Sequence, residues 1–214
     1  MPNADLIFCP RCAERLEWRG VEYPGVLHPA CPKCGFILWQ NVKPSVDALI
    51  VRGESPHVEV LLGRQSAARA NGQWGIPGGF LSVGDHIEAA LIRECRREMG
   101  IEVMVGELVG AFEGMFYDIP MVDLIYACTI ASGEPRAADL IDEVRWFPLG
   151  DPPPLALEIE RDAMRCDGRV ATKARRVTLA PICEIGEICG SAPVTRPSGG
   201  TPAWRFGRPC RTSC

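Results

Sequence analysis

The sequence contains no apolar run that approaches the roughly 20 residues of a membrane-spanning helix. Its first residues, Met-Pro-Asn-Ala-Asp-Leu-Ile-Phe, also lack the basic and then apolar order of a secretory signal peptide. Because both features are missing, we expect no membrane partner and a cytoplasmic protein. The chain has 214 residues, of which 47% are hydrophobic, which favours one domain of about 150 residues and a smaller unit.

A basic surface is missing from most of the chain as well. The net charge of -4 conceals an asymmetry, because residues 168–214 carry eight Lys or Arg and only two Glu. The preceding residues therefore hold 15 basic and 25 acidic side chains. This acidic part disfavours a broad nucleic-acid-binding surface and suits a protein that holds phosphates through a few cations and a metal ion. A zinc-ribbon protein that binds nucleic acid through its basic tail stays as a third alternative.

Cysteine is abundant, with 11 residues, and four of them form two Cys-x2-Cys pairs. Cys9 and Cys12 make the first pair, and Cys31 and Cys34 follow after 18 intervening residues. Two such pairs are typical of a zinc ribbon, in which four thiolates bind one Zn²⁺ at about 2.3 Å. A redox dithiol is the competing interpretation. We predict a ribbon over residues 1–40 with a structural zinc, which supplies much of the folding free energy of so short a segment.

A glycine loop and an acidic helix follow in the middle of the chain. The apolar stripe of this helix comprises Ile87, Ala90, Leu91 and Cys95. Asp85, with Glu88 three residues later, predicts a capping box and a helix that begins at about His86. Gly100 is placed to end the helix. We therefore expect an amphipathic helix whose apolar stripe faces a core.

Glu94 and Glu98 lie four residues apart on this helix, so their carboxylates project from adjacent turns toward one point. One interpretation is a solvated face on which Arg93, Arg96 and Arg97 balance the charge. The other is a hard-cation site, because oxygen ligands at this spacing suit Mg²⁺ or Mn²⁺, with waters and substrate phosphates completing the shell. The helix spacing alone does not decide between them.

The stretch around these glutamates resembles the box of the Nudix hydrolases, Gly-x5-Glu-x7-Arg-Glu-U-x-Glu-Glu-x-Gly-U, where U is a large apolar residue. The matching positions are Gly79, Arg93, Glu94, Glu98, Gly100 and Ile101. The resemblance implies an α/β (α+β) fold over residues 41–167, the Nudix α/β/α sandwich with a mixed sheet. It also implies a pyrophosphohydrolase in which Glu94, Glu98 and the Gly78 carbonyl bind Mg²⁺ or Mn²⁺. Arg93 would form a salt bridge with Asp85 that fixes the helix against the loop.

Two positions depart from the box. Asp85 replaces its first Glu, which keeps the charge and shortens the reach by one methylene. Arg97 replaces the first residue of the Glu-Glu pair, so a cation stands where the family has an acid. Arg97 would weaken the hold on a divalent ion, point along the helix surface, or bind a substrate phosphate as a bidentate fork. These departures leave a second interpretation, a catalytically weakened Nudix fold that serves as a nucleotide-binding sensor or interaction module.

A zinc ribbon ahead of the box resembles the organisation of NADH pyrophosphatases and of a related branch that includes plant FAD pyrophosphatases. The Ser-Gln-Pro-Trp-Pro-Phe-Pro sequence of the NADH enzymes does not follow the box, and the step over residues 41–44 is closer to the second branch. The resemblance implies a nucleotide substrate, a nucleoside diphosphate linked to another moiety. FAD, NADH, ADP-ribose and dinucleoside polyphosphates are the candidates.

Other candidate residues lie on either side of the box. By resemblance, Arg64 meets substrate phosphates, and a plain surface arginine is the alternative. Phe116 and Tyr117, in a predicted loop Glu113–Pro120, are placed to sandwich a purine or flavin, unless they serve packing. Glu143, in a predicted late loop, is a candidate general base or extra metal ligand, and a solvated acid is the alternative.

Regular elements are predicted at several other places in the chain. Four strand-like runs cover Ser45–Val51, Val58–Gly63, Ile101–Phe112 and Met121–Ile130, the first two as a hairpin. Leu155–Cys166 has the spacing of a closing helix. Residues 168–214 lack periodicity and are predicted to form a disordered basic tail. The sequence leaves a homodimer open.

Overall fold

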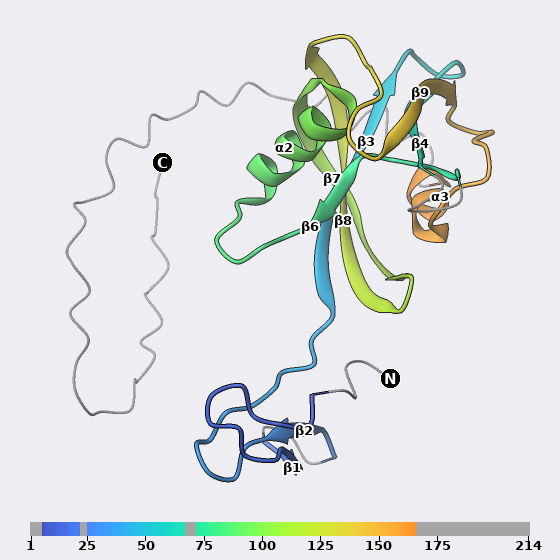
Figure 1. The fold of residues 1–214 in the computed structure, drawn as a ribbon. Helices are drawn as coiled ribbons and strands as arrows, with labels where there is room; N and C mark the ends of the chain where they lie inside the picture. The colour runs from blue at the N-terminus through green and yellow to red at the C-terminus, as the bar shows by residue number, and fades with distance from the viewer. Residues whose placement is uncertain (1–5, 22–24, 67–71, 166–214) are drawn as a thin grey trace, which may run out of the picture. The chain divides into compact units, whose positions relative to one another are not determined.

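The structure is a computed structural model, shown in Figure 1, that describes residues 6–21, 25–66 and 72–165. Its elements are β1 (Glu17–Gly20), β2 (Leu27–Ala30), β3 (Lys43–Arg52), β4 (Glu59–Gln65), β5 (Trp74–Gly75), β6 (Gly78–Phe80), α2 (Ile87–Met99), β7 (Glu102–Phe116), β8 (Ile119–Ser132), β9 (Ile141–Pro148) and α3 (Glu158–Arg165). The tail predicted over residues 168–214 lies outside the described residues. No helix in the described ranges combines the length and apolar character needed to cross a bilayer.

The N-terminal residues form a small ribbon with little apolar interior. Strands β1 and β2 pair antiparallel, and all four residues of β1 are exposed. Each cysteine pair closes a tight turn, in which the Ala13 amide donates to the Cys9 carbonyl at 2.9 Å and the Gly35 amide to the Cys31 carbonyl at 3.2 Å. Gly35 has a φ of 71°, which favours glycine. The ribbon therefore has tight turns where the sequence places its cysteine pairs.

Seven strands in the described part of the chain form a mixed sheet. The order is β5-β4-β3-β8-β7, with β6 beside β3 and β9 beside β4. Strands β3 and β8 are parallel, and the other pairs are antiparallel. Strand β3 lies at the centre, because residues 43–50 pair with β8, residues 45–47 also pair with β6, and residues 51–52 pair with β4. The mixed sheet and the hairpin of β3 and β4 confirm two predictions.

Helices α2 and α3 cover opposite faces of this sheet (Figure 1). Successive side chains of a strand point to opposite faces, so β3 contributes to two cores. Val46 and Ile50 pack in the core that includes α2. Leu49 and Val51 pack in the core that includes α3. The result is the α/β/α sandwich, with α3 as the closing helix predicted near residues 155–166.

The N-terminus of α2 differs from the predicted capping box. The helix begins at Ile87, its N-cap is His86, and no side chain caps it. The Asp85 carboxylate instead accepts a hydrogen bond from the Ser82 amide at 3.0 Å and pairs with Arg93. The prediction that Asp85 is the N-cap was therefore wrong, because a turn of the glycine loop and an arginine two turns along the helix take its oxygens.

The C-terminus of α2 ends at Gly100, as predicted. Gly100 has a φ of 67°, and its amide closes the last helical turn. The segment after β8 reaches the same helix end, where the Arg136 amide donates to the Met99 carbonyl at 3.0 Å and the Ala138 amide to the Glu98 carbonyl at 3.1 Å. These bonds satisfy carbonyls that a helix end would otherwise leave unpaired.

Strands β7 and β8 form a longer hairpin than the sequence predicted. The expected loop Glu113–Pro120 was wrong, because β7 continues to Phe116 and β8 starts at Ile119. Gly114, within the expected loop, lies in β7. A Cβ atom there would lie 2.9 Å from a side-chain atom of Ile159 in α3. The glycine therefore permits close packing of α3 on the strand.

We predict that Gly78→Ala destabilises the protein by at least about 2 kcal/mol. A Cβ atom at this position would lie 2.5 Å from the Val46 carbonyl oxygen and 1.9 Å from Asp47 Oδ1. Gly150→Ala is the control, because its added methyl group meets no heavy atom within 4 Å. Urea denaturation measures both variants, and an equal free energy of unfolding in the two would contradict the prediction.

Candidate active site

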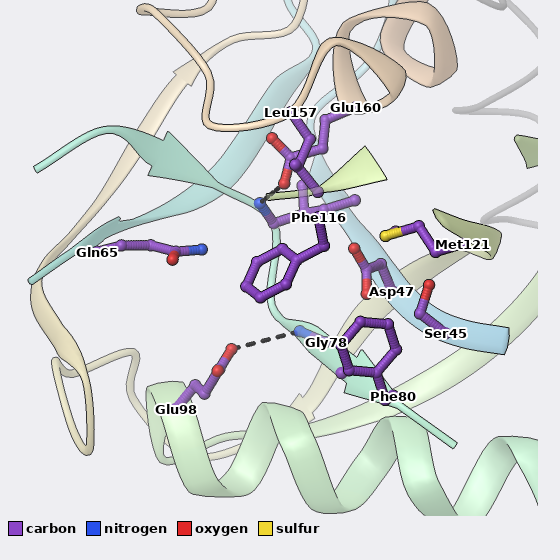
Figure 2. Close-up of a pocket in the computed structure, with 12 residues that line it drawn as sticks. Ser45, Asp47, Gln65, Gly78, Phe80, Glu98, Phe116, Met121, Leu157 and Glu160 are labelled. Atoms are coloured by element: carbon purple, nitrogen blue, oxygen red, sulfur yellow. Dashed lines mark hydrogen bonds between the residues drawn. The ribbon is translucent and has the colours of Figure 1, made fainter. Parts of the chain in front are cut away.

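Glu94 and Glu98 are both buried at the junction of α2 and β6. Only 8% of Glu94 and 3% of Glu98 is exposed to solvent. The Gly78 amide donates to Glu98 Oε2 at 3.3 Å, as Figure 2 shows. A Cβ atom at Gly79 would lie 3.3 Å from the Glu94 carboxylate carbon, so the glycine loop passes directly against the acids. The two residues are therefore not on a solvated face.

A single guanidinium contacts both carboxylates. Arg97 Nε donates to Glu94 Oε2 at 2.8 Å, and Arg97 Nη2 donates to Glu98 Oε1 at 3.0 Å. The same Nη2 also contacts Glu94 Oε2, and Nη1 contacts Asp139. Although burial opposes it, the charges and hydrogen bonds of these acids raise the pKa of Arg97. Arg97 therefore balances the negative charge at the point where the two glutamates meet.

Arg93 braces the site from the other side. Its two terminal nitrogens each lie 3.2 Å from one oxygen of Asp85, and its Nε donates to Glu94 Oε1 at 3.2 Å. The hydrogen bond from Arg93 lowers the pKa of Asp85. The shorter Asp side chain thus still reaches a bidentate contact, and the predicted salt bridge is present.

The two carboxylates offer the oxygen donors that a hard divalent cation prefers. Arg97 Nη2 stands between Glu94 Oε2 and Glu98 Oε1, at the place of an ion that both would share. The carboxylate oxygens of Glu94 and Glu98 are therefore suitable ligands for such an ion, provided that the Arg97 guanidinium leaves its position between them.

A cavity of about 100 Å³ lies next to Glu98. Its lining includes Ser45, Asp47, Gly78, Phe80, Glu98, Phe116, Met121 and Glu160 (Figure 2). The rings of Phe80 and Phe116 meet edge to face with centroids 5.7 Å apart. One wall is thus aromatic and another is acidic, directly beside the glutamate pair.

The acidic wall contains residues that the sequence did not reveal as site residues. Asp47 is 7% exposed, and Glu160 on α3 is 1% exposed. Asp123 is fully buried behind them and accepts a hydrogen bond from Ser45 Oγ at 2.9 Å. Burial raises the pKa of Asp47, to which the charge of Asp123 adds, and burial raises the pKa of Asp123 as well. Burial also raises the pKa of Glu160 to about 8.

A sequence feature for these acids does exist. Asp47 and Asp123 interrupt apolar runs that form the central strands, and Glu160 lies next to buried Ile159 in the closing helix. An acid in a strand that is covered on both faces has to be buried. The parallel register of β3 and β8, which sets Ser45 opposite Asp123, is not readable from local sequence.

The remaining candidates are distributed between the cavity and the sheet. Phe116 lines the cavity, whereas Tyr117 is 64% exposed and is not among the lining residues. Arg64 and Glu143 lie opposite each other on β4 and β9, with a 3.4 Å ion pair. The prediction of a loop at Glu143 was wrong, because the residue lies within β9, where it also contacts Arg145.

The four ribbon cysteines form a second candidate site. Their Sγ atoms all lie within 4.8 Å of one another. The Cys9 and Cys34 sulfurs are 3.5 Å apart, as are those of Cys12 and Cys31. Tetrahedral thiolates at a metal–sulfur distance of 2.3 Å would be about 3.8 Å apart. The cluster therefore fits a tetrahedral metal ion.

Comparison with known proteins adds a family and several relatives. A model of the NUDIX domain matches residues 42–166. The NAD-capped RNA hydrolase NudC of Pseudomonas aeruginosa is 32% identical over 150 residues, which cover 69% of this chain and 50% of that protein. The ADP-ribose pyrophosphatase of Methanocaldococcus jannaschii is 27% identical over 126 residues, covering 58% of this chain and 72% of that protein. The chain spans about half the length of the NudC proteins that it matches.

Solved structures support the fold. A NUDIX hydrolase from Nitrosomonas europaea has a TM-score of 0.64 at 23% identity, covering 78% of this chain and 94% of its own. A MutT NUDIX hydrolase from Burkholderia pseudomallei has a TM-score of 0.51 at 28% identity, covering 59% and 98%. The predicted sandwich is therefore confirmed.

We predict that Glu160→Gln stabilises the protein increasingly as the pH rises. The native Glu160 carboxyl holds its proton up to about pH 8, whereas the ordinary pKa is 4.5. Because the native state binds more protons over this window, the contribution of Glu160 to stability is fully present below pH 4.5 and is lost as the pH rises through about 8. The amide does not titrate, so the free energy of unfolding of the variant relative to the original protein should rise by up to about 4 kcal/mol between pH 5 and 8.5.

Urea denaturation at several pH values measures this difference. Glu158→Gln, at an exposed position of the same helix, is the matched control and should show little pH-dependent change. A constant difference between Glu160→Gln and the original protein across the range would rule the explanation out.

Proposed function

This chain belongs to the Nudix family, and from that premise we propose that it hydrolyses the diphosphate bond of a nucleoside diphosphate linked to another moiety. The observation that carries the proposal is the buried pair of Glu94 and Glu98 against the glycine loop. The pair lies at the edge of a cavity with an aromatic and an acidic wall. The product of such a reaction is two phosphorylated compounds.

The names of the relatives support this substrate class. They are a NAD-capped RNA hydrolase and an ADP-ribose pyrophosphatase. NAD and ADP-ribose both contain an adenosine diphosphate whose second phosphate is joined to another group. We therefore keep FAD, NADH and ADP-ribose as candidate substrates, and the common element is the nucleoside diphosphate.

The cavity suits one part of such a molecule. Its volume of about 100 Å³ is in the range of a single ring, and Phe80 and Phe116 provide aromatic edges. Glu160 also lines it, and Glu160 Oε2 has no hydrogen-bond partner among the described residues. A polar group on the bound moiety would find a partner there.

Glu94, Glu98 and the Gly78 carbonyl would hold Mg²⁺ or Mn²⁺ in this proposal. When bound, the ion neutralises charge on the phosphate oxygens and lowers the pKa of a bound water. Arg93 keeps the Glu94 carboxylate oriented, because Asp85 holds its guanidinium from the other side.

Arg64 and Glu143 have proposed roles that depend on one another. We assign Arg64 to phosphate binding and Glu143 to proton transfer or metal binding. Their 3.4 Å ion pair holds the Glu143 carboxylate near the end of β4. If a phosphate draws Arg64 away, Arg145 is the remaining contact that Glu143 has to exchange before it takes either role.

A second candidate function is a nucleotide-binding sensor with little or no turnover. The observation that favours it is the contact of Arg97 with both glutamates. A guanidinium at this place can attract a phosphate, and it opposes a divalent ion. The cavity would then serve recognition alone.

We predict that Glu98→Gln lowers the turnover of a cleaved substrate by at least about 100-fold. The amide keeps the size of the side chain and removes the charge that would hold the ion. Purified protein is incubated with Mg²⁺ or Mn²⁺ and with FAD, NADH or ADP-ribose, and the phosphorylated products are quantified by chromatography.

Glu102→Gln is the control, because the Glu102 side chain is partly exposed and its partner is Arg96 rather than a cavity residue. If the original protein cleaves no compound with either metal, hydrolysis of this substrate class is wrong. Binding of the same compounds without cleavage, measured by calorimetry, would establish the sensor.

We further propose that the cysteine cluster holds a structural Zn²⁺. Four thiols of the right spacing support this, and four protein ligands leave no open position for catalysis. Two backbone amides, of Arg11 and Cys34, each donate to a cluster sulfur at 3.4 Å. Although burial opposes it, backbone hydrogen bonds lower the pKa of Cys31 to about 7.

We predict that Cys31→Ser weakens zinc binding by at least about 100-fold, since one thiolate ligand is lost. Zinc content after dialysis, measured by mass spectrometry, should fall from one ion per chain to a small fraction of that amount. Cys95→Ala removes a buried thiol outside the cluster and should keep equimolar zinc. Retention of zinc by Cys31→Ser would speak against a four-cysteine site.

A further inference from the structure

The hydrogen bonds of the two box glutamates already involve all of their oxygens. Glu94 Oε1 accepts from Arg93 Nε at 3.2 Å, and Glu94 Oε2 accepts from Arg97 Nε at 2.8 Å. Glu98 Oε1 accepts from Arg97 Nη2 at 3.0 Å, and Glu98 Oε2 from the Gly78 amide at 3.3 Å. A carboxylate oxygen has two lone pairs, so the position of these donors decides whether a new cation can reach both carboxylates.

Arg97 is the donor that lies in the way. Its Nη2 contacts an oxygen of each glutamate, so the guanidinium occupies the point where the carboxylates converge. Both acids are more than nine-tenths buried, and two such charges side by side require a cation. Arg97 fills this need with a side chain of the protein itself.

The other two arginines of the helix are held elsewhere. Arg93 is fixed by both oxygens of Asp85 and reaches Glu94 alone of the pair. Arg96 is paired with Glu102, its Nη2 lying 2.9 Å from that carboxylate. Among the described residues, Arg97 is thus the arginine whose contacts include both glutamates.

Arg97 has an outward route that the two glutamates lack. Its side chain is 40% exposed, and its Nη1 contacts Asp139, whose side chain is 36% exposed. The bond from the Ala138 amide to the Glu98 carbonyl, 3.1 Å long, holds Asp139 next to the helix end. The guanidinium can therefore move toward solvent, where a diphosphate offers it bidentate acceptors.

We propose that Arg97 is a resident cation that competes with a divalent ion for Glu94 and Glu98 and that a nucleoside diphosphate removes by binding the guanidinium. The competition stands on the contacts of Arg97, and the removal by nucleotide rests on the proposed function. Because nucleotide and ion each favour the displaced Arg97, each raises the affinity of the other. Arg97 then makes ion binding depend on substrate.

Binding of Mn²⁺ without nucleotide tests the competition. We expect Arg97→Gln to bind Mn²⁺ at least about tenfold more tightly than the original protein, because charged hydrogen bonds no longer have to be broken. Electron paramagnetic resonance of free Mn²⁺ gives the affinities, and thermal denaturation shows that each variant is folded. Arg97→Lys keeps the charge without the planar fork, so its affinity should lie between the two.

Arg96→Gln is the matched control, since it makes the same change in net charge one residue away without contacting the pair. Its Mn²⁺ affinity should stay within about twofold of the original, because exposed charges are screened by salt. The competition is overturned if Arg97→Gln binds Mn²⁺ no more tightly than the original protein. It is also overturned if Arg96→Gln has as large an effect.

Repeating the titration with α,β-methylene-ADP tests the removal step. This analogue has an uncleavable bond between its phosphorus atoms, so binding is measured without turnover. In each protein, the analogue's effect is the factor by which it lowers the Mn²⁺ dissociation constant. This factor should be at least about fivefold larger for the original protein than for Arg97→Gln. Equal factors would overturn the removal step. If the analogue binds neither the original protein nor the variants, the removal step is wrong, while the product assay decides the proposed function and the nucleotide-free titrations decide the competition.

Discussion

The burial of two like charges on one helix dictates most of the arrangement around α2. Glu94 and Glu98 are separated by one turn, and solvent reaches little of either. Their repulsion is offset by hydrogen-bond donors from two sides, an amide of the glycine loop and the guanidinium of Arg97. The loop can come this close to Glu94 only because Gly79 lacks a side chain. The two buried charges thus account for the glycine at position 79 and for the arginine at position 97.

The acidic wall of the cavity follows from the position of β3. This strand is covered on both faces, so its buried apolar residues are divided between the two cores. Leu49 and Val51 face the side of α3, and Asp47 has the same parity along the strand. The alternation of a buried strand therefore carries an acid toward Glu160, and burial keeps both carboxyls protonated to higher pH than usual.

The parts of the site that sequence predicted are those set by local geometry. The helix period brought Glu94 and Glu98 together, Gly100 ended the helix, and Asp85 was correctly paired with Arg93. The errors arose where distant residues intervene. Asp85 does not cap the helix because Ser82 and Arg93 bind its oxygens, and the loop expected over residues 113–120 is mostly strand because β7 and β8 pair as far as Phe116 and Ile119. Likewise, the grouping of Asp47, Asp123 and Glu160 depends on a parallel strand register and on helix packing, which no local pattern encodes.

The two candidate functions differ in how much free energy is required to move the Arg97 guanidinium away from Glu94 and Glu98. Each 1.4 kcal/mol or so required for this step lowers the apparent affinity for a divalent ion about tenfold. A low cost leaves a hydrolase whose metal site opens with substrate, and a high cost leaves a protein that binds nucleotide through the guanidinium alone. Asp139 contributes to this balance, because it is the acid that contacts Arg97 on the solvent side. Whether this protein acts as an enzyme or as a sensor therefore depends on that free energy, which the contacts of the Arg97 side chain determine.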